Sequence, residues 1–302
     1  MRQAGKSPGG LEMNCVITGA TSGIGRATAR RLAALGANLV IVGRNARAGR
    51  EVVRDLQRLV PAAEVAFVQA DLSNLNDVRR LAADIGDTFS RLHVLINNAG
   101  ARFDTYRMTP DGIELTFATN HLGHFLLTCL LYDSLVRAGG ARVITVASGS
   151  HHGANTADGW FPSREKYDRR LAYGNSKLAN VLFGYELARR VSGTTVTSNI
   201  ADPGGVATNF ARNNGVVAWV RHLMAHTLSR DLISPHKGAE GIVYLATSEE
   251  VNGVNGKYFH RGRVVESSPY SRNPEAARQL WELSIEVSGV RDRLPGSLVA
   301  RA

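Results

Sequence analysis

Cysteine is scarce in this sequence of 302 residues, which contains only Cys15 and Cys129. A disulfide-stabilised scaffold is therefore excluded, and because each cysteine lies in an apolar run we expect two buried free thiols. Long hydrophobic runs are also missing. The longest, such as Leu122–Leu131, are shorter than the ~20 residues that a membrane-spanning helix needs. Residues 1–12 lack the apolar stretch of a secretory signal, so we expect a cytoplasmic protein without a membrane span.

Positive charge is abundant but not clustered. The chain has 36 Lys and Arg residues against 26 Asp and Glu residues, and its formal net charge is +10. Long basic blocks, zinc-finger spacings and aromatic residues interleaved with basic ones are all absent, so we expect no nucleic-acid binding. A solvated surface and an anionic cofactor account for the charge. The histidine pairs lack the Glu of a His-Glu-x-x-His motif, and we expect no bound metal.

From Met13 onward, short apolar runs alternate with longer helical patterns, which is typical of repeated βαβ units. The expected strands are Cys15–Thr18, Asn38–Val42, Val65–Ala70, Val94–Asn97, Arg142–Val146, Thr195–Ile200 and Gly256–Phe259. The expected helices are Gly25–Leu35, Ala48–Val60, Asn76–Phe89, Asp111–Val136, Ala172–Val191 and His236–Thr247. We predict an α/β Rossmann fold with one doubly wound, mostly parallel seven-stranded sheet and helices on both faces. This single domain spans 13–290, between a flexible N-terminal extension (1–12) and a C-terminal tail (291–302).

A glycine-rich turn follows the first strand and precedes a helix, in the sequence Thr18-Gly19-Ala20-Thr21-Ser22-Gly23-Ile24-Gly25. Gly19 permits a tight turn, Gly23 lets backbone amides approach a pyrophosphate, and Gly25 lets the helix pack close to the strand. Ser22 and Ile24 belong to the same turn, at the helix end whose free N–H groups suit phosphates. A tight turn without a ligand is the alternative for this motif alone.

Arg44 follows the second strand, at the position where an acidic residue would accept the ribose hydroxyls of NAD. A guanidinium binds a 2′-phosphate through charge-assisted hydrogen bonds, so the sequence predicts NADP(H) as the cofactor. A plain surface arginine is the alternative. Asp71 and Leu72, after the third strand, are positioned to flank the adenine, although Asp71 is equally suited to cap the next helix.

The fourth strand ends in Asn97-Asn98-Ala99-Gly100. The small and carboxamide side chains at Asn98, Ala99 and Gly100 let this strand end approach a bound cofactor. An asparagine there can also tie neighbouring strands together through bonds to the backbone, and a structural turn is equally consistent with the motif.

Tyr173 and Lys177 lie four residues apart in a predicted helix and therefore on one face. An ammonium close to a phenol stabilises the phenolate and lowers the phenol pKa, which produces a general acid/base. Ser148 follows the fifth strand at the same edge of the sheet, where its hydroxyl can hold a substrate carbonyl oxygen. A Tyr and a Lys at this spacing also occur by chance as a surface pair.

Taken together and in this order, the motifs resemble the short-chain dehydrogenase/reductase superfamily over about residues 13–290. They are the glycine turn, Asn97–Gly100, Ser148, the Tyr173-x-x-x-Lys177 helix and Asp202-Pro203-Gly204. Three segments most resemble its retinol dehydrogenase and WW-domain oxidoreductase-like branch, without a WW domain: Thr119–Thr128, Ser148 with His151-His152, and Gly253–Phe259. The resemblance implies an NADP-dependent oxidoreductase acting on CH–OH or C=O groups of a small hydrophobic molecule, and a homodimer or homotetramer.

The resemblance also implies a role for each site residue. Tyr173 is the general acid in reduction and the base in oxidation, while Ser148 orients the carbonyl. Lys177 lowers the Tyr173 pKa and binds the nicotinamide ribose, and Asn120 holds a water that relays protons to Lys177. Three residues border the nicotinamide: Pro203, Gly204 and Thr208. Three departures from the family pattern are present. Ala147 replaces a frequent serine, Asp202 replaces a neutral residue or histidine, and Arg102 and Phe103 follow the Asn97–Gly100 motif without a role that the resemblance assigns.

Between Thr208 and Arg230 apolar side chains recur at helical spacing, which predicts an amphipathic lid that closes over a hydrophobic substrate. A helix packed permanently on the core and a helix on a membrane surface are the alternatives. The alternative function is a non-catalytic, NADP-binding regulator that senses redox state. The joint presence of Asn120, Ser148, Tyr173 and Lys177 argues against it.

Overall fold

The structure is a computed structural model that describes residues 13–157, 159–160, 162–206, 233–294 and 298. Two predictions lie outside these residues: the N-terminal extension at 1–12 and the lid at 208–230, with Thr208. Most of the predicted C-terminal tail also lies outside them.

The described residues form one eight-stranded sheet in the order β3-β2-β1-β4-β5-β6-β7-β8. The strands are β1 (Asn14–Thr18), β2 (Asn38–Gly43), β3 (Val65–Gln69), β4 (Val94–Asn97), β5 (Arg142–Val146), β6 (Thr197–Asp202), β7 (Tyr258–His260) and β8 (Arg263–Val264). The first seven strands pair in parallel, and β8 pairs antiparallel with β7. The strand order reverses at β1 and β4, which confirms the doubly wound Rossmann topology.

The predicted count of seven strands is wrong by one. β8 has only two residues and follows β7 through a turn at Arg261 and Gly262, where φ is +50° and +79°. Two successive left-handed residues are the type I′ geometry of a tight hairpin. Periodicity could not reveal β8 because two exposed residues are too few to form a pattern.

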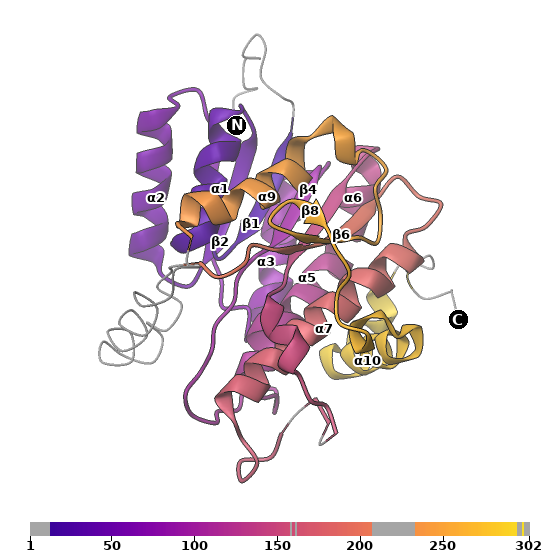
Figure 1. The fold of residues 1–302 in the computed structure, drawn as a ribbon. Helices are drawn as coiled ribbons and strands as arrows, with labels where there is room; N and C mark the ends of the chain where they lie inside the picture. Colours follow the sequence, from indigo (N-terminus) through magenta and orange to yellow (C-terminus); the bar gives the residue numbers. More distant parts are fainter. Residues whose placement is uncertain (1–12, 158, 161, 207–232, 295–297, 299–302) are drawn as a thin grey trace.

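Helices cover both faces of the sheet (Figure 1). One face carries α1 (Gly23–Ala34), α2 (Ala46–Leu59) and α9 (Pro235–Thr247), and the other carries α3 (Leu75–Thr88), α5 (Gly123–Leu130), α6 (Tyr132–Ala138), α7 (Arg169–Arg190) and α10 (Pro274–Ser288). Side chains that alternate along β1 divide between the two cores, with Cys15 and Ile17 in the first and Val16 in the second. Both cysteines are buried and free, as predicted.

The predicted helix at Asp111–Val136 is wrong in its extent. The observed elements are α4 (Leu115–Phe117), a π-helical turn at Ala118–Leu122, α5 and α6. In the π turn the N–H of Gly123 donates to the carbonyl of Ala118, five residues earlier. Such turns are frequent at functional sites, and this one contains Asn120.

The last helix predicted from the sequence is His236–Thr247, so α10 was not predicted. This helix has ordinary end signals, since the Asn273 side chain caps its first turn and Gly289, with φ of +60°, ends it. Trp281 of α10 is buried and stacks on Phe183 of α7, with ring centroids 5.9 Å apart. α10 thus closes the core that lies over α7.

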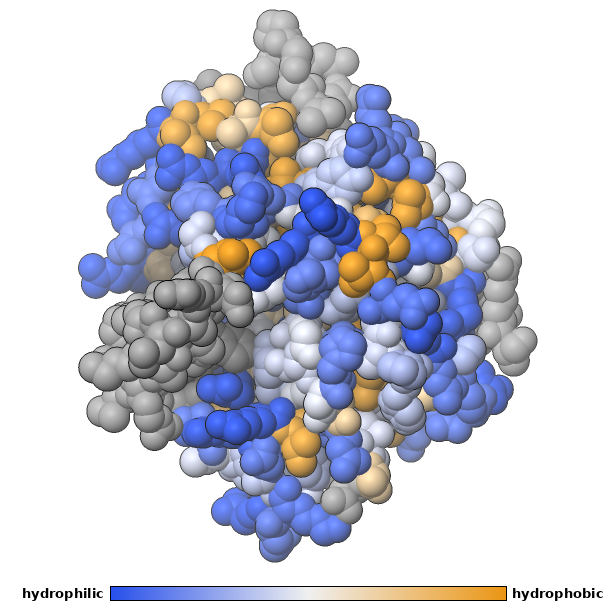
Figure 2. Space-filling view, viewed as in Figure 1, coloured by the Kyte–Doolittle hydropathy of each residue, from blue (hydrophilic) through white to orange (hydrophobic). Residues whose placement is uncertain are grey.

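The surface is mostly polar on the face drawn in Figure 2, where hydrophilic side chains predominate over α2 and hydrophobic ones form small separate groups. No helix within the described ranges is long and apolar enough to cross a membrane. The same ranges contain no group of three or more His, Cys, Asp or Glu side chains that could hold a metal ion.

Candidate active site

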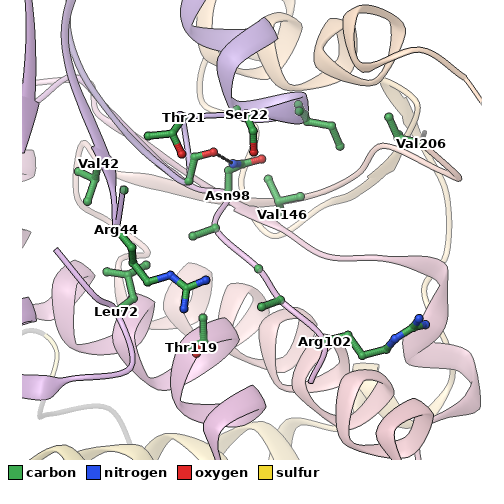
Figure 3. A pocket seen from close by; sticks show the side chains of 18 of the residues that line it. Thr21, Ser22, Val42, Arg44, Leu72, Asn98, Arg102, Thr119, Val146 and Val206 are labelled. Carbon is green, nitrogen blue, oxygen red and sulfur yellow. Dashed lines mark hydrogen bonds between the residues drawn. The ribbon is translucent and has the colours of Figure 1, made fainter. Parts of the chain in front are cut away.

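A cleft of about 1250 Å³ lies at the carboxyl ends of the parallel strands (Figure 3). Its walls come from the glycine turn, from the segments that follow β2 to β6, and from α7. The carboxyl edge is where open α/β sheets bind ligands, because the loops there diverge at the reversal of strand order. Most of the predicted cofactor and catalytic residues therefore line one cleft.

The glycine turn leaves no room for a side chain at Gly19 or Gly25. Gly19 and Gly23 have φ of +67° and +55°, which favours glycine. A Cβ on Gly19 would lie 2.7 Å from the Cα of Ala99, and one on Gly25 would lie 2.5 Å from the Gly19 carbonyl oxygen. Ser22 precedes α1 without a side-chain capping bond, and the first turn has no acidic residue. This helix end thus suits an anionic group.

Asn98 joins β1 to β4 directly below the glycine turn. Its Nδ2 donates to the Thr18 carbonyl oxygen at 2.7 Å. The Thr18 hydroxyl oxygen accepts from the backbone N–H groups of Asn98 and Ala99, at 2.9 and 3.0 Å. Asn98, Ala99 and Gly100 all line the cleft, so the strand-tying and cleft-lining interpretations of this motif both hold.

Arg44 directly follows β2, and Figure 3 shows its side chain extending into the cleft on the side of Leu72. Arg47 lines the same end and pairs with Glu51 at 3.1 Å. Sequence reasoning missed Arg47, although a second arginine three residues after Arg44 was visible in the sequence. Two guanidinium groups therefore lie at this end of the cleft, and that of Arg47 is paired with a carboxylate.

Asp71 lines the cleft but does not cap the next helix. Its Oδ1 accepts from the backbone N–H and the hydroxyl of Ser73, at 3.0 and 2.8 Å. Asn74 caps α3 instead. Asp71 therefore shapes the turn that follows β3 and brings Leu72 to the cleft wall.

Lys177 is buried at the end of the cleft that Ser148 and Tyr173 also line. It is 3% exposed, and its Nζ donates to the Val146 carbonyl oxygen at 3.1 Å. The same Nζ lies 5.7 Å from the ring centroid of Tyr173, one helical turn away on α7. Burial lowers the pKa of Lys177 to about 8, and the negative charge of Asp202 acts in the opposite direction.

Tyr173 is partly buried beside Lys177 and Ser148. Burial raises its pKa to about 12, and the hydrogen bond to Ser148 and the charge of Arg102 offset this only partly. The lowered pKa that the sequence argument expects is therefore wrong for the protein alone, because desolvation of the phenolate outweighs the stabilising groups.

His151 links the Ser148 loop to the segment at Ser268 through two hydrogen bonds. The Ser148 Oγ accepts from the backbone N–H of Ser150 at 3.2 Å. The His151 Nδ1 donates to the Ser148 carbonyl oxygen at 2.8 Å, while its Nε2 accepts from the N–H of Ser268 at 3.1 Å. Burial lowers the pKa of His151, in keeping with the neutral ring that these two bonds require.

Asn120 lies behind the cleft wall and not in it. Its Oδ1 accepts from the N–H of Ala101 at 2.7 Å, and its Nδ2 donates to the Ala101 carbonyl and to the Ser176 hydroxyl. A Cβ on Gly100 would lie 3.3 Å from the Lys177 Nζ and 3.7 Å from the Asn120 Oδ1. A side chain at position 100 would therefore crowd both Lys177 and Asn120.

The cleft unites nearly all of the predicted site residues. Those that line it are Gly19, Ser22, Gly23, Ile24, Gly25, Arg44, Asp71, Leu72, Asn98, Ala99, Gly100, Ser148, Tyr173, Lys177, Pro203 and Gly204. Sequence reasoning noted Arg102 but gave it no role, whereas it lines the cleft close enough to influence Tyr173. Its position just after the Asn97–Gly100 motif was the available signal.

Comparison with known proteins agrees with this geometry. A family model described as short chain dehydrogenase matches residues 13–216. Human retinol dehydrogenase 12 is 37% identical over 276 residues, which are 91% of this chain and 86% of that protein. Human polyprenol dehydrogenase is 37% identical over 284 residues, 92% of this chain and 85% of that protein.

Solved structures agree as well. An uncharacterized protein of Mycobacterium paratuberculosis superposes with a TM-score of 0.73 at 33% identity, covering 93% of this chain and 95% of that one. RhlG of Pseudomonas aeruginosa, solved as an active-site complex with NADP, has a TM-score of 0.66 at 25% identity and covers 84% and 97% of the two chains.

Proposed function

We propose a specific reaction from the premise that this chain belongs to the short-chain dehydrogenase family, in its retinol dehydrogenase-like branch. As a member it is an NAD(P)-dependent oxidoreductase that acts on CH–OH groups of small molecules. The proposal is that it uses NADP(H), that its substrate is a hydrophobic alcohol or the corresponding aldehyde or ketone, and that Tyr173 transfers the proton. The observation that carries this proposal is the convergence of Ser148, Tyr173 and Lys177 on the cleft that begins at the glycine turn.

The cleft residues fit a dinucleotide. A Cβ at Gly19 or Gly25 would collide with Ala99, with Asn98 or with the turn itself. Glycine at both positions therefore keeps the tight turn that cradles a pyrophosphate in this fold. The uncapped start of α1 favours the phosphates. Arg44 and Arg47 favour an additional phosphate on the adenosine ribose, because guanidinium groups bind phosphate oxygens with charge-assisted hydrogen bonds. When bound, the nicotinamide supplies or accepts the hydride.

The chain's own residues handle the proton and the orientation of the substrate. A Tyr173 phenol with a pKa near 12 is protonated at neutral pH and is suited to donate to a carbonyl oxygen as that oxygen becomes an alkoxide. Ser148, hydrogen-bonded to Tyr173, holds the same oxygen. Lys177 supplies positive charge that stabilises a developing phenolate, and Asn120 holds a water that relays protons to Lys177.

The proposed substrate class rests on relatives and on the sequence between positions 208 and 230. Curated relatives are named for retinol and polyprenol, which are long apolar alcohols. The apolar residues at helical spacing in that segment suit a hydrophobic chain. The described end of the cleft adds small and apolar contacts at Val146, Ala147 and Val206.

The cofactor proposal is tested by Kd values for NADPH and NADH, measured by fluorescence titration. We expect a preference for NADPH of about tenfold to a hundredfold, from about 1.5–3 kcal/mol for a charge-assisted hydrogen bond. Arg44→Asp is expected to shrink or invert it. Arg50→Asp makes the same charge change on exposed α2 outside the cleft lining and is expected to leave the preference unchanged. Equal Kd values for NADPH and NADH in the parent protein would show that Arg44 does not bind the 2′-phosphate and is only a surface charge.

A further inference from the structure

A buried carboxylate lies immediately behind the reactive end of the cleft. Asp202 is the last residue of β6, and its side chain is 5% exposed. Its neighbour Ala201 is in register with Val146 of β5, and the Val146 carbonyl holds the Lys177 ammonium. Asp202 therefore lies on the strand next to β5, one residue beyond the position that pairs with Val146.

Three donors hold this carboxylate in place. Its Oδ1 accepts from the N–H of Gly204 at 2.9 Å. Its Oδ2 accepts from the Tyr258 hydroxyl at 2.8 Å and from the His260 Nδ1 at 3.1 Å. Donors therefore point at both oxygens of the carboxylate. A Cβ on Gly149 would lie 3.8 Å from Oδ2, so the carboxylate also lies directly beneath the Ser148 loop.

Several charged or titratable groups face Asp202 from the elements around it. They are Tyr173 and Lys177 on α7, His151 in the loop after Ser148, and Tyr258 and His260 on β7. The backbone N–H of Arg261, in the turn after β7, donates to the Asp202 carbonyl oxygen. The negative charge of Asp202 raises the pKa of both Lys177 and Tyr173. Its field therefore reaches the groups that carry the proposed reaction.

We propose that Asp202 balances positive charge at the nicotinamide end of the cleft and so favours binding of the oxidised cofactor over the reduced one. The inference rests on the NADP(H) binding proposed above. An oxidised nicotinamide ring is a cation, and beside the buried Lys177 ammonium it would face strong repulsion in a cleft of low dielectric constant. A buried carboxylate next to Gly204, which lines the cleft, offsets that repulsion. The reduced ring is neutral and gains nothing from it.

The test compares Kd values for NADP+ and NADPH at neutral pH without substrate, in the parent protein and in Asp202→Asn. The two cofactors have the same phosphate and ribose groups and differ only in the nicotinamide ring, so the ratio of their Kd values reports on the ring and its charge. Asp202→Asn keeps the shape and an accepting oxygen but removes the charge. We expect NADP+ to bind about threefold to tenfold more weakly and NADPH to stay within about twofold.

Two further variants separate charge from structure. Tyr258→Phe removes one hydrogen bond to Asp202 but keeps the carboxylate, and its ratio is expected to match that of the parent. His260→Lys, at a half-exposed position, adds a permanent cation beside Asp202 and is expected to weaken NADP+ binding selectively, so it tests the charge if Asp202→Asn fails to fold.

An unchanged ratio in Asp202→Asn or His260→Lys overturns the inference, and so does a loss shared equally by both cofactors or an equal effect of Tyr258→Phe. If the parent protein binds neither cofactor, the proposed function fails with it. If it binds both and only the ratio is insensitive to Asp202, the proposed function stands and the role of Asp202 is wrong.

Discussion

Replacement of Lys177 by Met should make the protein more stable while it abolishes turnover. The ammonium is 3% exposed, and burial holds its pKa at about 8, below the ordinary 10.5. A lysine with a lowered pKa in the folded state is a charge that folding has to desolvate. Methionine has a similar length and no charge, so it fills the same space without that penalty.

The magnitude follows from the two pKa values. They differ by about 2.5, which corresponds to about 3 kcal/mol at about 1.36 kcal/mol for each tenfold change. The hydrogen bond to the Val146 carbonyl is lost in the variant, at a cost of about 1 kcal/mol. We therefore expect Lys177→Met to be about 2 kcal/mol more stable than the parent near pH 7.

The pH dependence has a definite sign. Below pH 8 both states carry the charge, and the parent bears the full penalty. Between pH 8 and 10.5 the unfolded chain binds more protons than the folded one, so the stability of the parent rises with pH. The advantage of Lys177→Met should therefore shrink over this interval and be lost above it.

The assay is urea unfolding at several pH values between 7 and 10.5, for the parent, Lys177→Met and Lys237→Met. Lys237 is 64% exposed and pairs with Glu240, so its replacement is expected to change stability by less than about 0.5 kcal/mol. A Lys177→Met protein that is less stable than the parent at neutral pH, or a difference that does not vary with pH, would refute the reasoning. Turnover that survives the substitution would remove Lys177 from the mechanism.

Two other predictions concern the cradle and the substrate. Gly25→Ala puts a Cβ 2.5 Å from the Gly19 carbonyl oxygen, so we expect NADPH affinity to fall at least about tenfold in a fluorescence titration. Gly86→Ala, on α3 with no atom within 4 Å of the added Cβ, should bind NADPH with the affinity of the parent. Equal NADPH affinities of the two variants would contradict the role of Gly25 in cofactor binding. Along a homologous series of aliphatic aldehydes, kcat/KM should rise by up to ~0.8 kcal/mol in equivalent free energy for each methylene until the cleft is full. A flat series excludes the apolar site.

The sequence was most informative where local chemistry and fold require the same residue. Gly19 and Gly25 are needed by close backbone contacts, and apolar runs such as Val94–Asn97 are buried strands, so pattern and structure agree there. The position of Asp202 could not be predicted from the sequence pattern. The predicted strand at Thr195–Ile200 ends two residues before β6 does, which left Asp202 outside the strand and concealed its pairing with His260.

Other features depend on contacts that no local pattern carries. The π turn at Asn120 interrupts an apolar helical pattern that continues on both sides. The pKa of Tyr173 depends on burial by segments distant in sequence, and spacing from Lys177 gives no information about desolvation. The Asn273 and Gly289 signals of α10 were visible, but its burial against α7 became evident only in three dimensions.

The most direct test of the proposed chemistry is Tyr173→Phe, compared with the parent for NADPH binding and for NADPH oxidation with a medium-chain aliphatic aldehyde. The substitution removes only the hydroxyl, which lies near Ser148. We expect the Kd for NADPH to stay within a few-fold and turnover to fall at least about a hundredfold, because the proton donor is lost. Undiminished turnover in Tyr173→Phe would contradict the account.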